Sequence, residues 1–432
     1  MSLPDLTTAI ADASGDRHRA FRLAESAALS IAKGFEGERR SFISVGASPA
    51  TADAVAVGPL TGTIFSVKDN IDVGGQVTTC GSRVLENAPP ATEDAWIVSA
   101  LKDAGAICVG KNNLHEFALG ATGQNVRFGD TPNPFDAGRH VGGSSGGSTI
   151  AVADGEVHLA IGTDSGGSVR MPASFAGITG YKPTPGVLPM HGVAGASWSM
   201  DCLGLLTKSV GDMRKVWDAI VPHSGAADAK APRIAYLHDH SMGRVAAPIW
   251  SHYLATIAKL SDAGFKLQGV SVPGLEICPQ VCVSVVYPEV ASAHLELMRA
   301  HPQLYEQDVR ALVALGELWS GRHYLDAQRI RTVVRARLED AISGHDFFLT
   351  PTIAIQPLHF GETARVEGDP PGSALYPIMR FTVPFNVVSY PAISVRAGLD
   401  CDGLPVGLQV IARPREDGAL LAVAEKMEQA LA

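Results

Sequence analysis

Two serine-bearing glycine loops lie close together in the chain. Residues 142–148 are Gly-Gly-Ser-Ser-Gly-Gly-Ser, and residues 162–172 are Gly-Thr-Asp-Ser-Gly-Gly-Ser-Val-Arg-Met-Pro. Glycine has no Cβ and allows positive φ, so each loop can turn sharply and point backbone N–H groups at a reacting atom. Serine hydroxyls beside such amides are suited to attack a carbonyl carbon and to stabilise the oxyanion that forms.

The elements around these loops must hold the serines in place. Residues 145–154 are expected to form a short helix that stops at Gly155, which puts Ser144 at the helix entrance. Residues 157–162 are expected to form a buried strand, and Pro172 suits the first turn of the next helix, with Ser168 about at its N-cap. A helix N-terminus favours negative charge, so the Ser168 hydroxyl would lie beside an anion site.

A lysine, Lys68, closes another apolar segment, residues 63–68. Burial disfavours the charged ammonium and lowers the pKa of a lysine toward neutrality, where the free amine can act as a general base. The alternative is a surface lysine that pairs with Asp69 or Asp72. On the local sequence alone, the surface pairing is the commoner outcome.

The two serine loops resemble the signature of one enzyme family, the amidase signature family of serine amidohydrolases. The resemblance extends to Ile-Phe-Ser-Val-Lys-Asp at 64–69, Gly-Tyr-Lys-Pro-Thr at 180–184 and Gly-Leu-Pro-Val-Gly-Leu-Gln at 403–409. These motifs occur in the family's order and together cover about residues 55 to 425. We therefore identify the chain as a member of this family.

The resemblance implies roles for individual residues. Lys68 would be the general base, Ser144 a bridging serine on a cis peptide bond with Gly143, and Ser168 the nucleophile. This reverses the preference for a surface lysine. The oxyanion would be held by four backbone amides, those of Ser165, Gly166, Gly167 and Ser168.

Three further residues are expected to support the site. Asp164 and Arg170 flank the nucleophile and are expected to pair and brace the loop. Ser145 would either hydrogen-bond within the catalytic network or serve only as a helix cap. Both interpretations of Ser145 remain open.

The expected fold is α/β, with a large twisted mixed β-sheet flanked by α-helices on both faces. Strand and helix patterns alternate through the serine loops, and the family resemblance implies the same architecture. We expect one domain over residues 1–432, with core motifs at 55–215, a variable helical segment that covers the substrate at 279–344, and core strands and a helix at 345–432. Four local expectations are a connector at 44–62, a helix at 113–119, a surface loop at 131–143 and a long helix over 303–343. Residues 225–232 are expected to form a linker.

The substrate pocket is expected to draw on four segments, residues 117–124, 193–198, about 287–324 and 376–385. The candidate side chains are those of Phe117, Gln124, Trp198, Tyr324 and Arg380. Their aromatic groups favour an aryl or alkyl amide, whereas Arg380 and Arg322 would instead suit a carboxylate.

Composition excludes several classes of protein. The net charge of −9 argues against a nucleic-acid surface, and no apolar run is long enough to predict a membrane span. The six cysteines lack metal or redox spacing, so we expect buried reduced thiols, no metal and no cofactor. A cytoplasmic enzyme that acts on a small amide is expected, and a homodimer is compatible with this interpretation.

Three other functions compete with a free-standing amidohydrolase that cleaves a small carboxylic amide or a carbamoyl-type C–N bond. Residues 142–146 also fit Gly-x-Ser-x-Gly, which suggests a Ser-His-Asp hydrolase using His140, His158 or His191, although a proline-rich loop and not a strand precedes them. A phosphate-binding loop is disfavoured because the Gly-x-x-x-x-Gly-Lys pattern is missing. Residues 324–331 are similar to glutaminase-like subunits of tRNA-dependent amidotransferases, but those subunits usually carry an acidic residue where residues 378–380 are Ile-Met-Arg.

Overall fold

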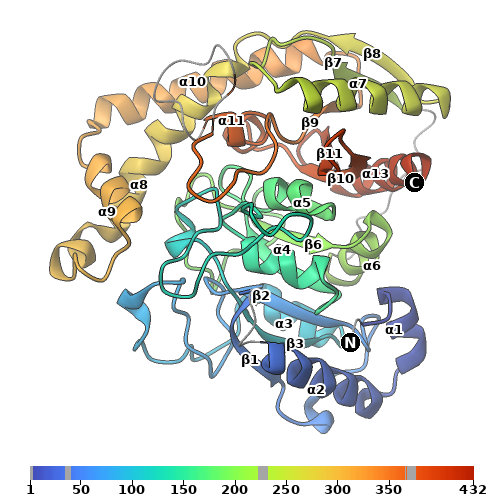
Figure 1. Cartoon of the computed structure of the whole chain (residues 1–432), viewed down its shortest axis with the longest axis vertical. Helices are drawn as coiled ribbons and strands as arrows, with labels where there is room; N and C mark the ends of the chain where they lie inside the picture. Colours follow the sequence, from blue (N-terminus) through green and yellow to red (C-terminus); the bar gives the residue numbers. More distant parts are fainter. Residues whose placement is uncertain (1–2, 35–39, 222–231, 365, 367–375) are drawn as a thin grey trace.

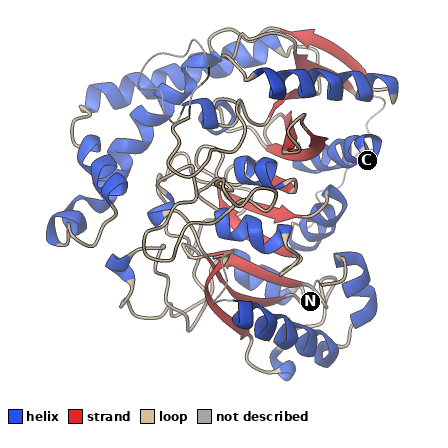
Figure 2. Ribbon diagram, viewed as in Figure 1, coloured by secondary structure: helices blue, strands red, loops and turns tan. Residues whose placement is uncertain are grey.

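One 11-stranded mixed sheet organises the described part of the chain. The computed structural model describes residues 3–34, 40–221, 232–364, 366 and 376–432. The strand order is β1-β3-β2-β4-β6-β5-β10-β11-β9-β7-β8, with both parallel and antiparallel neighbours. Helices cover both faces of this sheet, while α8, α9 and α10 extend along one side of the molecule (Figures 1 and 2). The expected α/β class with a mixed sheet is confirmed.

The strands are β1 (Phe42–Ser48), β2 (Ile64–Lys68), β3 (Ile107–Asn112), β4 (Leu159–Thr163), β5 (Thr179–Lys182), β6 (Leu203–Thr207), β7 (Arg233–Leu237), β8 (Lys266–Val270), β9 (Phe347–Pro351), β10 (Ala392–Leu399) and β11 (Pro405–Ala412). The helices are α1 (Leu6–Ala13), α2 (Arg17–Gly34), α3 (Trp96–Asp103), α4 (Gly146–Ala153), α5 (Arg170–Ala176), α6 (Val210–Ile220), α7 (Ala247–Asp262), α8 (Cys278–Ala300), α9 (Gln307–Gly316), α10 (Gly321–Ala341), α11 (Tyr376–Met379), α12 (Val383–Val387) and α13 (Asp417–Leu431). Short 3-10 turns lie at Ala52–Ala54, Arg83–Leu85, Glu116–Ala118 and Leu275–Ile277.

The side chains of the central strands divide between two apolar layers. In β2, Phe65 and Val67 pack with residues of α3, α6 and α13, whereas Ile64 packs with residues of α2, α4 and α5. In β4, Leu159 and Ile161 join the first layer and Ala160 joins the second. Successive strand residues point to opposite faces, so an apolar run is buried on both sides.

The sheet topology brings the lysine to the serine loops. Strands β2 and β4 are parallel neighbours, with Val67 paired to Ile161. Their carboxyl ends therefore meet at one edge of the sheet, the edge where ligands bind in α/β folds. Lys68 ends β2 there, and the second serine loop begins directly after Thr163 of β4.

The edge strand β1 corrects the expectation of a connector over residues 44–62. Phe42–Ser48 pairs antiparallel with β3, with register shifts at both ends of the pairing. Most residues of β1 are only partly buried, because it lies at the end of the sheet. A half-buried edge strand with small residues lacks the apolar pattern that identifies central strands. Strands β6 and β8 were likewise not anticipated.

A 3-10 turn replaces the helix expected at residues 113–119. Phe117 and Ala118 have positive φ values of 51° and 62°. The Asn113 side-chain oxygen accepts from the N–H of Leu114 at 2.8 Å, and its amide donates to two backbone carbonyls. Such local side-chain bonds compete with helix formation.

The helix expected over residues 303–343 is two helices, α9 and α10. The break comes where Ser320 caps α10 by accepting from the N–H of His323 at 3.3 Å. The 131–143 segment is irregular as expected but is not superficial, because Thr131, His140 and Val141 are buried. Most of the linker expected at 225–232 lies outside the described residues.

One described segment, Leu275–Ala300, is long and apolar enough to cross a membrane by length and composition. It contains the whole of α8. Cys278, Val281 and Val285 of this helix are buried in an apolar cluster with Phe348 and Phe385, and core helices of water-soluble proteins pass the same test. The expectation of no membrane partner stays a prediction.

Candidate active site

Lys68 lies fully buried at the end of β2 with its amine held by two hydroxyls. Its Nζ is 2.7 Å from Ser144 Oγ and 2.8 Å from Thr163 Oγ1. Burial lowers the pKa of Lys68 to about 7, although the nearby Asp201 and Asp164 carboxylates act in the opposite direction. The amine is therefore substantially unprotonated near neutral pH, as a general base requires.

The surface alternative for Lys68 is wrong. Asp69 pairs instead with Lys111, at 2.8 Å between Oδ1 and Nζ. Asp72 accepts from the hydroxyl of Thr78 at 2.6 Å. Neither carboxylate is the partner of Lys68.

The first serine loop presents Ser144 to the lysine. The Gly143–Ser144 peptide bond is cis, in agreement with the family resemblance. The next residue, Ser145, lies at the N-cap position of α4 but makes no capping hydrogen bond with its side chain. Its hydroxyl donates instead to the carbonyl of Thr163 at 3.3 Å, so Ser145 links the loop to β4.

Ser168 lies close to a helix start, although not at the expected N-cap. The N-cap of α5 is Val169, because the helix begins at Arg170. The Ser168 carbonyl accepts from the N–H of Ser145 at 3.2 Å, which joins the two serine loops. The side of Ser168 that remains exposed, 9% of the residue, faces a cavity.

Asp164 and Arg170 brace the second loop as expected. Arg170 donates to both carboxylate oxygens of Asp164, at 3.0 and 2.9 Å, and both side chains are fully buried. Burial alone would raise the pKa of Asp164, but the Arg170 charge and hydrogen bonds to the carboxylate outweigh it and hold that pKa well below its usual range. Arg170 also donates to Gln409 at 2.7 Å and to Asn386 at 2.6 Å, which anchors the loop to β11 and α12.

The backbone amides of the second loop are not all available for an oxyanion. The N–H of Gly167 donates to Asp164 Oδ1 at 2.8 Å, so this amide, expected in the oxyanion hole, is already committed. Within the described chain, the amides of Ser165, Gly166 and Ser168 have no protein acceptor. The structure therefore leaves three candidate donors.

Asp201 is a site residue that sequence reasoning missed. Its carboxylate accepts from the hydroxyl of Ser165, which is 36 positions away in the chain, and from the N–H of Ser197 at 2.9 Å. Burial raises the pKa of Asp201, and hydrogen bonds from Ser165 and Ser197 together with the charge of Lys68 oppose that rise. A lone aspartate at such a separation gives no spacing signal, so only the pairing of β4 with β6 reveals it.

A cavity of about 420 Å³ opens beside Ser168. Each of the four segments expected to form the pocket contributes to its wall: residues 118–121 come from the first, Ala196 from the second, Tyr287 and Leu312 from the third, and Tyr376 and Met379 from the fourth. All four segments thus line one cavity, and its role as the substrate pocket stays a prediction.

The structure places all five candidate substrate side chains outside this wall. Phe117 stacks on Tyr305, with ring centroids 5.3 Å apart, and Gln124 accepts from Thr122. Trp198 is 69% exposed, Tyr324 donates to Glu289, and Arg380 donates to the carbonyl of Arg244. The expected segments line the cavity but these five side chains do not, because the direction of a side chain within a loop or helix depends on local dihedrals.

The histidine alternative has no support in the geometry. His158 is held in the core by the N–H of Ile64 at 3.0 Å, and burial lowers its pKa to about 4. His140 contacts the ring of Phe360, and His191 pairs with Glu93 at the surface. Among the described residues, none of these three histidines hydrogen-bonds to Ser144 or Ser168.

A metal site was not expected from the sequence. Among the described residues, no group of three His, Cys, Asp or Glu side chains could hold a metal ion. All six cysteines are free; five are buried as expected, but Cys401 is exposed.

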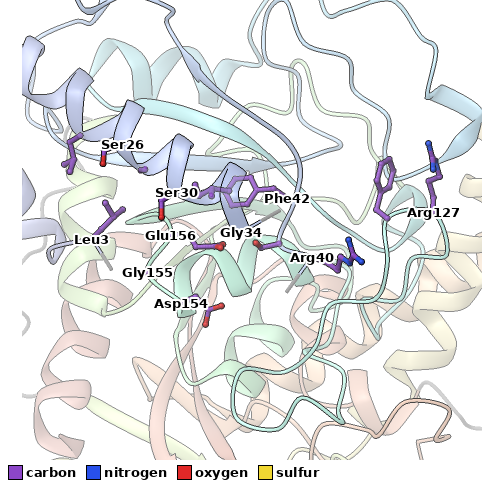
Figure 3. A pocket seen from close by; sticks show the side chains of 15 residues that line it. Leu3, Ser26, Ser30, Gly34, Arg40, Phe42, Arg127, Asp154, Gly155 and Glu156 are labelled. Atoms are coloured by element: carbon purple, nitrogen blue, oxygen red, sulfur yellow. The ribbon is translucent and has the colours of Figure 1, made fainter. Parts of the chain in front are cut away.

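A second cavity, of about 490 Å³, lies between α2, Phe42 of β1 and residues 154–156 (Figure 3). Neither Ser144 nor Ser168 lines this cavity.

The sheet and the serine and lysine groups at its edge define an α/β enzyme of the hydrolase class. The chain belongs to the amidase family, whose model matches residues 46–421. It is 33% identical to the A subunit of glutamyl-tRNA(Gln) amidotransferase from Synechococcus, over 91% of each chain. It is 35% identical to the protein of that name in Moorella thermoacetica, over 88% of this chain and 85% of the relative. A solved structure described as an amidase matches with a TM-score of 0.91 and 31% identity, over 99% of this chain and 100% of that chain.

Proposed function

We propose that the protein hydrolyses the C–N bond of a small carboxylic amide or carbamoyl compound through an ester formed on Ser168. The observation that carries this proposal is the contact between the buried amine of Lys68 and the hydroxyl of Ser144, at 2.7 Å. Ser144 follows a cis peptide bond in a loop tied to Ser168 through the Ser145 N–H. These contacts support a relay in which Lys68 is the base, Ser144 the bridging hydroxyl and Ser168 the nucleophile beside the cavity.

In the first half of the reaction, neutral Lys68 accepts the proton of Ser144 while Ser144 accepts the proton of Ser168. The Ser168 oxygen attacks the carbonyl carbon, and the carbonyl oxygen becomes an oxyanion. The amides of Ser165, Gly166 and Ser168 would bind it, and each such donor is worth on the order of 3 kcal/mol of the barrier. The C–N bond then breaks, and the proton returns through Ser144 to the departing nitrogen.

In the second half, water takes the place of the amine. The same serine and lysine relay accepts a proton from water, and the resulting oxygen attacks the ester carbon of Ser168. Collapse of the second oxyanion releases the carboxylic acid and returns the proton to Ser168. Apart from the amide and one water molecule, no further reactant enters the balance of atoms and charges.

A serine-directed fluorophosphonate tests the assignment of the nucleophile. We expect one adduct per chain, on the peptide that contains Ser168, and no adduct in a Ser168→Ala variant that also lacks amidase turnover. An adduct on Ser144 in the wild-type protein would reverse the roles of the two serines.

A second candidate function is the glutaminase subunit of an amidotransferase. The specific observation that favours it is the identity of 33% and 35% to two proteins of that name over most of both chains. In this case glutamine would be the amide, and the protein would work with partner subunits and a tRNA-bound substrate, against the expectation of no nucleic-acid partner. Glutamine hydrolysis that depends on added partner subunits and glutamyl-tRNA would establish this function. Under either candidate function, a cytoplasmic location and a homodimer remain predictions.

A further inference from the structure

The described residues that line the cavity beside Ser168 are uncharged and mostly apolar. We propose that its substrate is an uncharged amide that carries a branched alkyl or aryl group on the carbonyl carbon, and not an amino-acid or dicarboxylic amide. This inference rests on the proposed function, because it assumes that Ser168 attacks an amide in this cavity. It concerns the group that fills the cavity above the nucleophile.

Three of the lining residues belong to the second serine loop. They are Ser165, Gly166 and Ser168, whose groups are proposed to act on the carbonyl. The remaining wall is built largely from apolar side chains, among them Met171, Val283 and Val286. A carbonyl bound to the loop therefore directs its substituent against hydrocarbon.

No lining residue among those described carries a charge. The two tyrosines in the wall do not change this, because burial raises the pKa of Tyr287, and proximity to Tyr376 raises it further. Tyr287 is therefore neutral at physiological pH. The hydroxyls of these tyrosines suit a neutral polar group as well as the edge of an aryl ring.

The charges of Arg331, Asp201 and Glu289 act on the lining residue Cys282, and all three side chains are hydrogen-bonded to other protein groups. Arg331 donates to the carbonyl of Val387 at 3.0 Å and to that of Ser199 at 3.3 Å. The buried carboxylate of Glu289 accepts from Tyr324 at 2.8 Å and from the hydroxyl of Ser197. A ligand carboxylate or ammonium would have to break these bonds to gain a partner.

Charge in this cavity should consequently weaken binding. A charged group taken from water and left without a partner loses far more free energy than a neutral group of the same shape. Glutamine adds both an ammonium and a carboxylate to its amide, whereas succinamate adds one carboxylate. Isocaproamide has the shape of succinamate with an isopropyl group in place of the carboxylate, so the two form a matched pair.

The first experiment compares kcat/KM for isocaproamide, benzamide, succinamate and glutamine with the full-length wild-type enzyme. We expect the two neutral amides to exceed succinamate and glutamine by at least about a hundredfold. Glutamine or succinamate turned over as well as isocaproamide would overturn the inference while leaving the proposed hydrolysis intact.

A charge-insertion variant tests the same wall directly. Met379→Lys places a cation of similar length in the cavity, and Met379→Leu is the neutral control. We expect Met379→Lys to shift the isocaproamide to succinamate ratio toward succinamate by at least about tenfold, and Met379→Leu to keep the wild-type preference for the neutral amide. A second pair of variants on α9, Leu312→Arg with Leu312→Gln as its neutral control, repeats the comparison. The test can then still be made if one of the charged variants fails to fold. An unchanged ratio in folded Met379→Lys and Leu312→Arg proteins would contradict the inference.

Binding to a Ser168→Ala variant separates the inference from the proposed function. Calorimetric titration of this variant should detect isocaproamide or benzamide and a much weaker response to succinamate and glutamine. The same preference without any wild-type turnover would uphold the character of the cavity and refute the proposed hydrolysis. Tighter binding of glutamine would refute the inference whether or not the enzyme turns over amides.

Discussion

Lys68 Nζ and Ser144 Oγ lie 2.7 Å apart, although the two residues are 76 positions apart in the chain. One ends a central strand, and the other follows a glycine turn before α4. The lysine is fully buried, and desolvation lowers its pKa to about 7. Burial therefore favours the neutral amine of Lys68 at the edge of the sheet, which is the form that the proposed mechanism needs.

Replacement of Lys68 by methionine should nearly abolish turnover. Methionine preserves much of the buried volume but offers no proton acceptor, so we expect kcat to fall by a factor of about 10³ or more. Steady-state assays with circular dichroism as a folding check would measure this. His191→Ala is the control, since His191 pairs with Glu93 at the surface and should leave most activity in place. Loss of activity in folded His140, His158 or His191 variants would revive the histidine mechanism.

Asp201→Asn should move the pH dependence of kcat/KM. The Asp201 charge raises the pKa of Lys68, so its removal lowers that pKa and shifts the acidic limb to lower pH. Two other groups, Asp164 and Cys80, also act on the pKa of Lys68. Ser165 and Ser197 donate hydrogen bonds to Asp201.

Ser165→Ala is the matched variant for Asp201→Asn. It removes the hydrogen bond to Asp201 but keeps the carboxylate. We expect a lower kcat because the loop loses one of its anchors, and a smaller shift of the acidic limb than in Asp201→Asn because the carboxylate remains. The same limb shift in both variants would mean that Asp201 acts only by holding the loop.

Arg170→Met should destabilise the fold strongly. The substitution leaves the Asp164 carboxylate buried without its cation, which typically costs about 3–5 kcal/mol. Urea unfolding at neutral pH would measure the loss, and Arg329→Met, which removes an exposed pair with Asp326, should cost less than about 1 kcal/mol. An equal effect of the two variants would contradict the bracing role of Arg170.

The Asp164 brace also has a pH dependence. Its pKa in the folded protein is below the unfolded value, so the stability it contributes is present above the unfolded pKa near 3.8 and is lost as pH falls below it. The wild-type protein should therefore lose stability in acid more steeply than Arg170→Met. Parallel acid unfolding curves for the two proteins would show that Asp164 is not held by Arg170.

The sequence predicts local structure best at the two serine loops. Glycine, serine and proline there constrain the backbone locally, so the helix after Ser144 and the strand before Asp164 were predictable from residue types. The proximity of Lys68 to Ser144 came from the family resemblance, because a separation of 76 positions carries no local signal.

Tertiary contacts determine what the sequence could not indicate. The Gly167 amide is lost to the oxyanion because Asp164 accepts from it, and Asp201 reaches Ser165 only because β6 pairs with β4. The family resemblance indicates the segment that covers the substrate. It does not indicate the direction of the Phe117 side chain, which stacks on Tyr305 from a residue with a φ of 51°.

The rate of fluorophosphonate inactivation as a function of pH tests the central claim most directly, because it needs no substrate. If Lys68 activates Ser168 through Ser144, the rate should rise with pH about a midpoint near 7, where the pKa of Lys68 lies. The adduct should map to Ser168, and the Lys68→Met variant should react slowly at every pH. Fast labelling of Ser168 without Lys68, or an adduct on Ser144, would contradict the account.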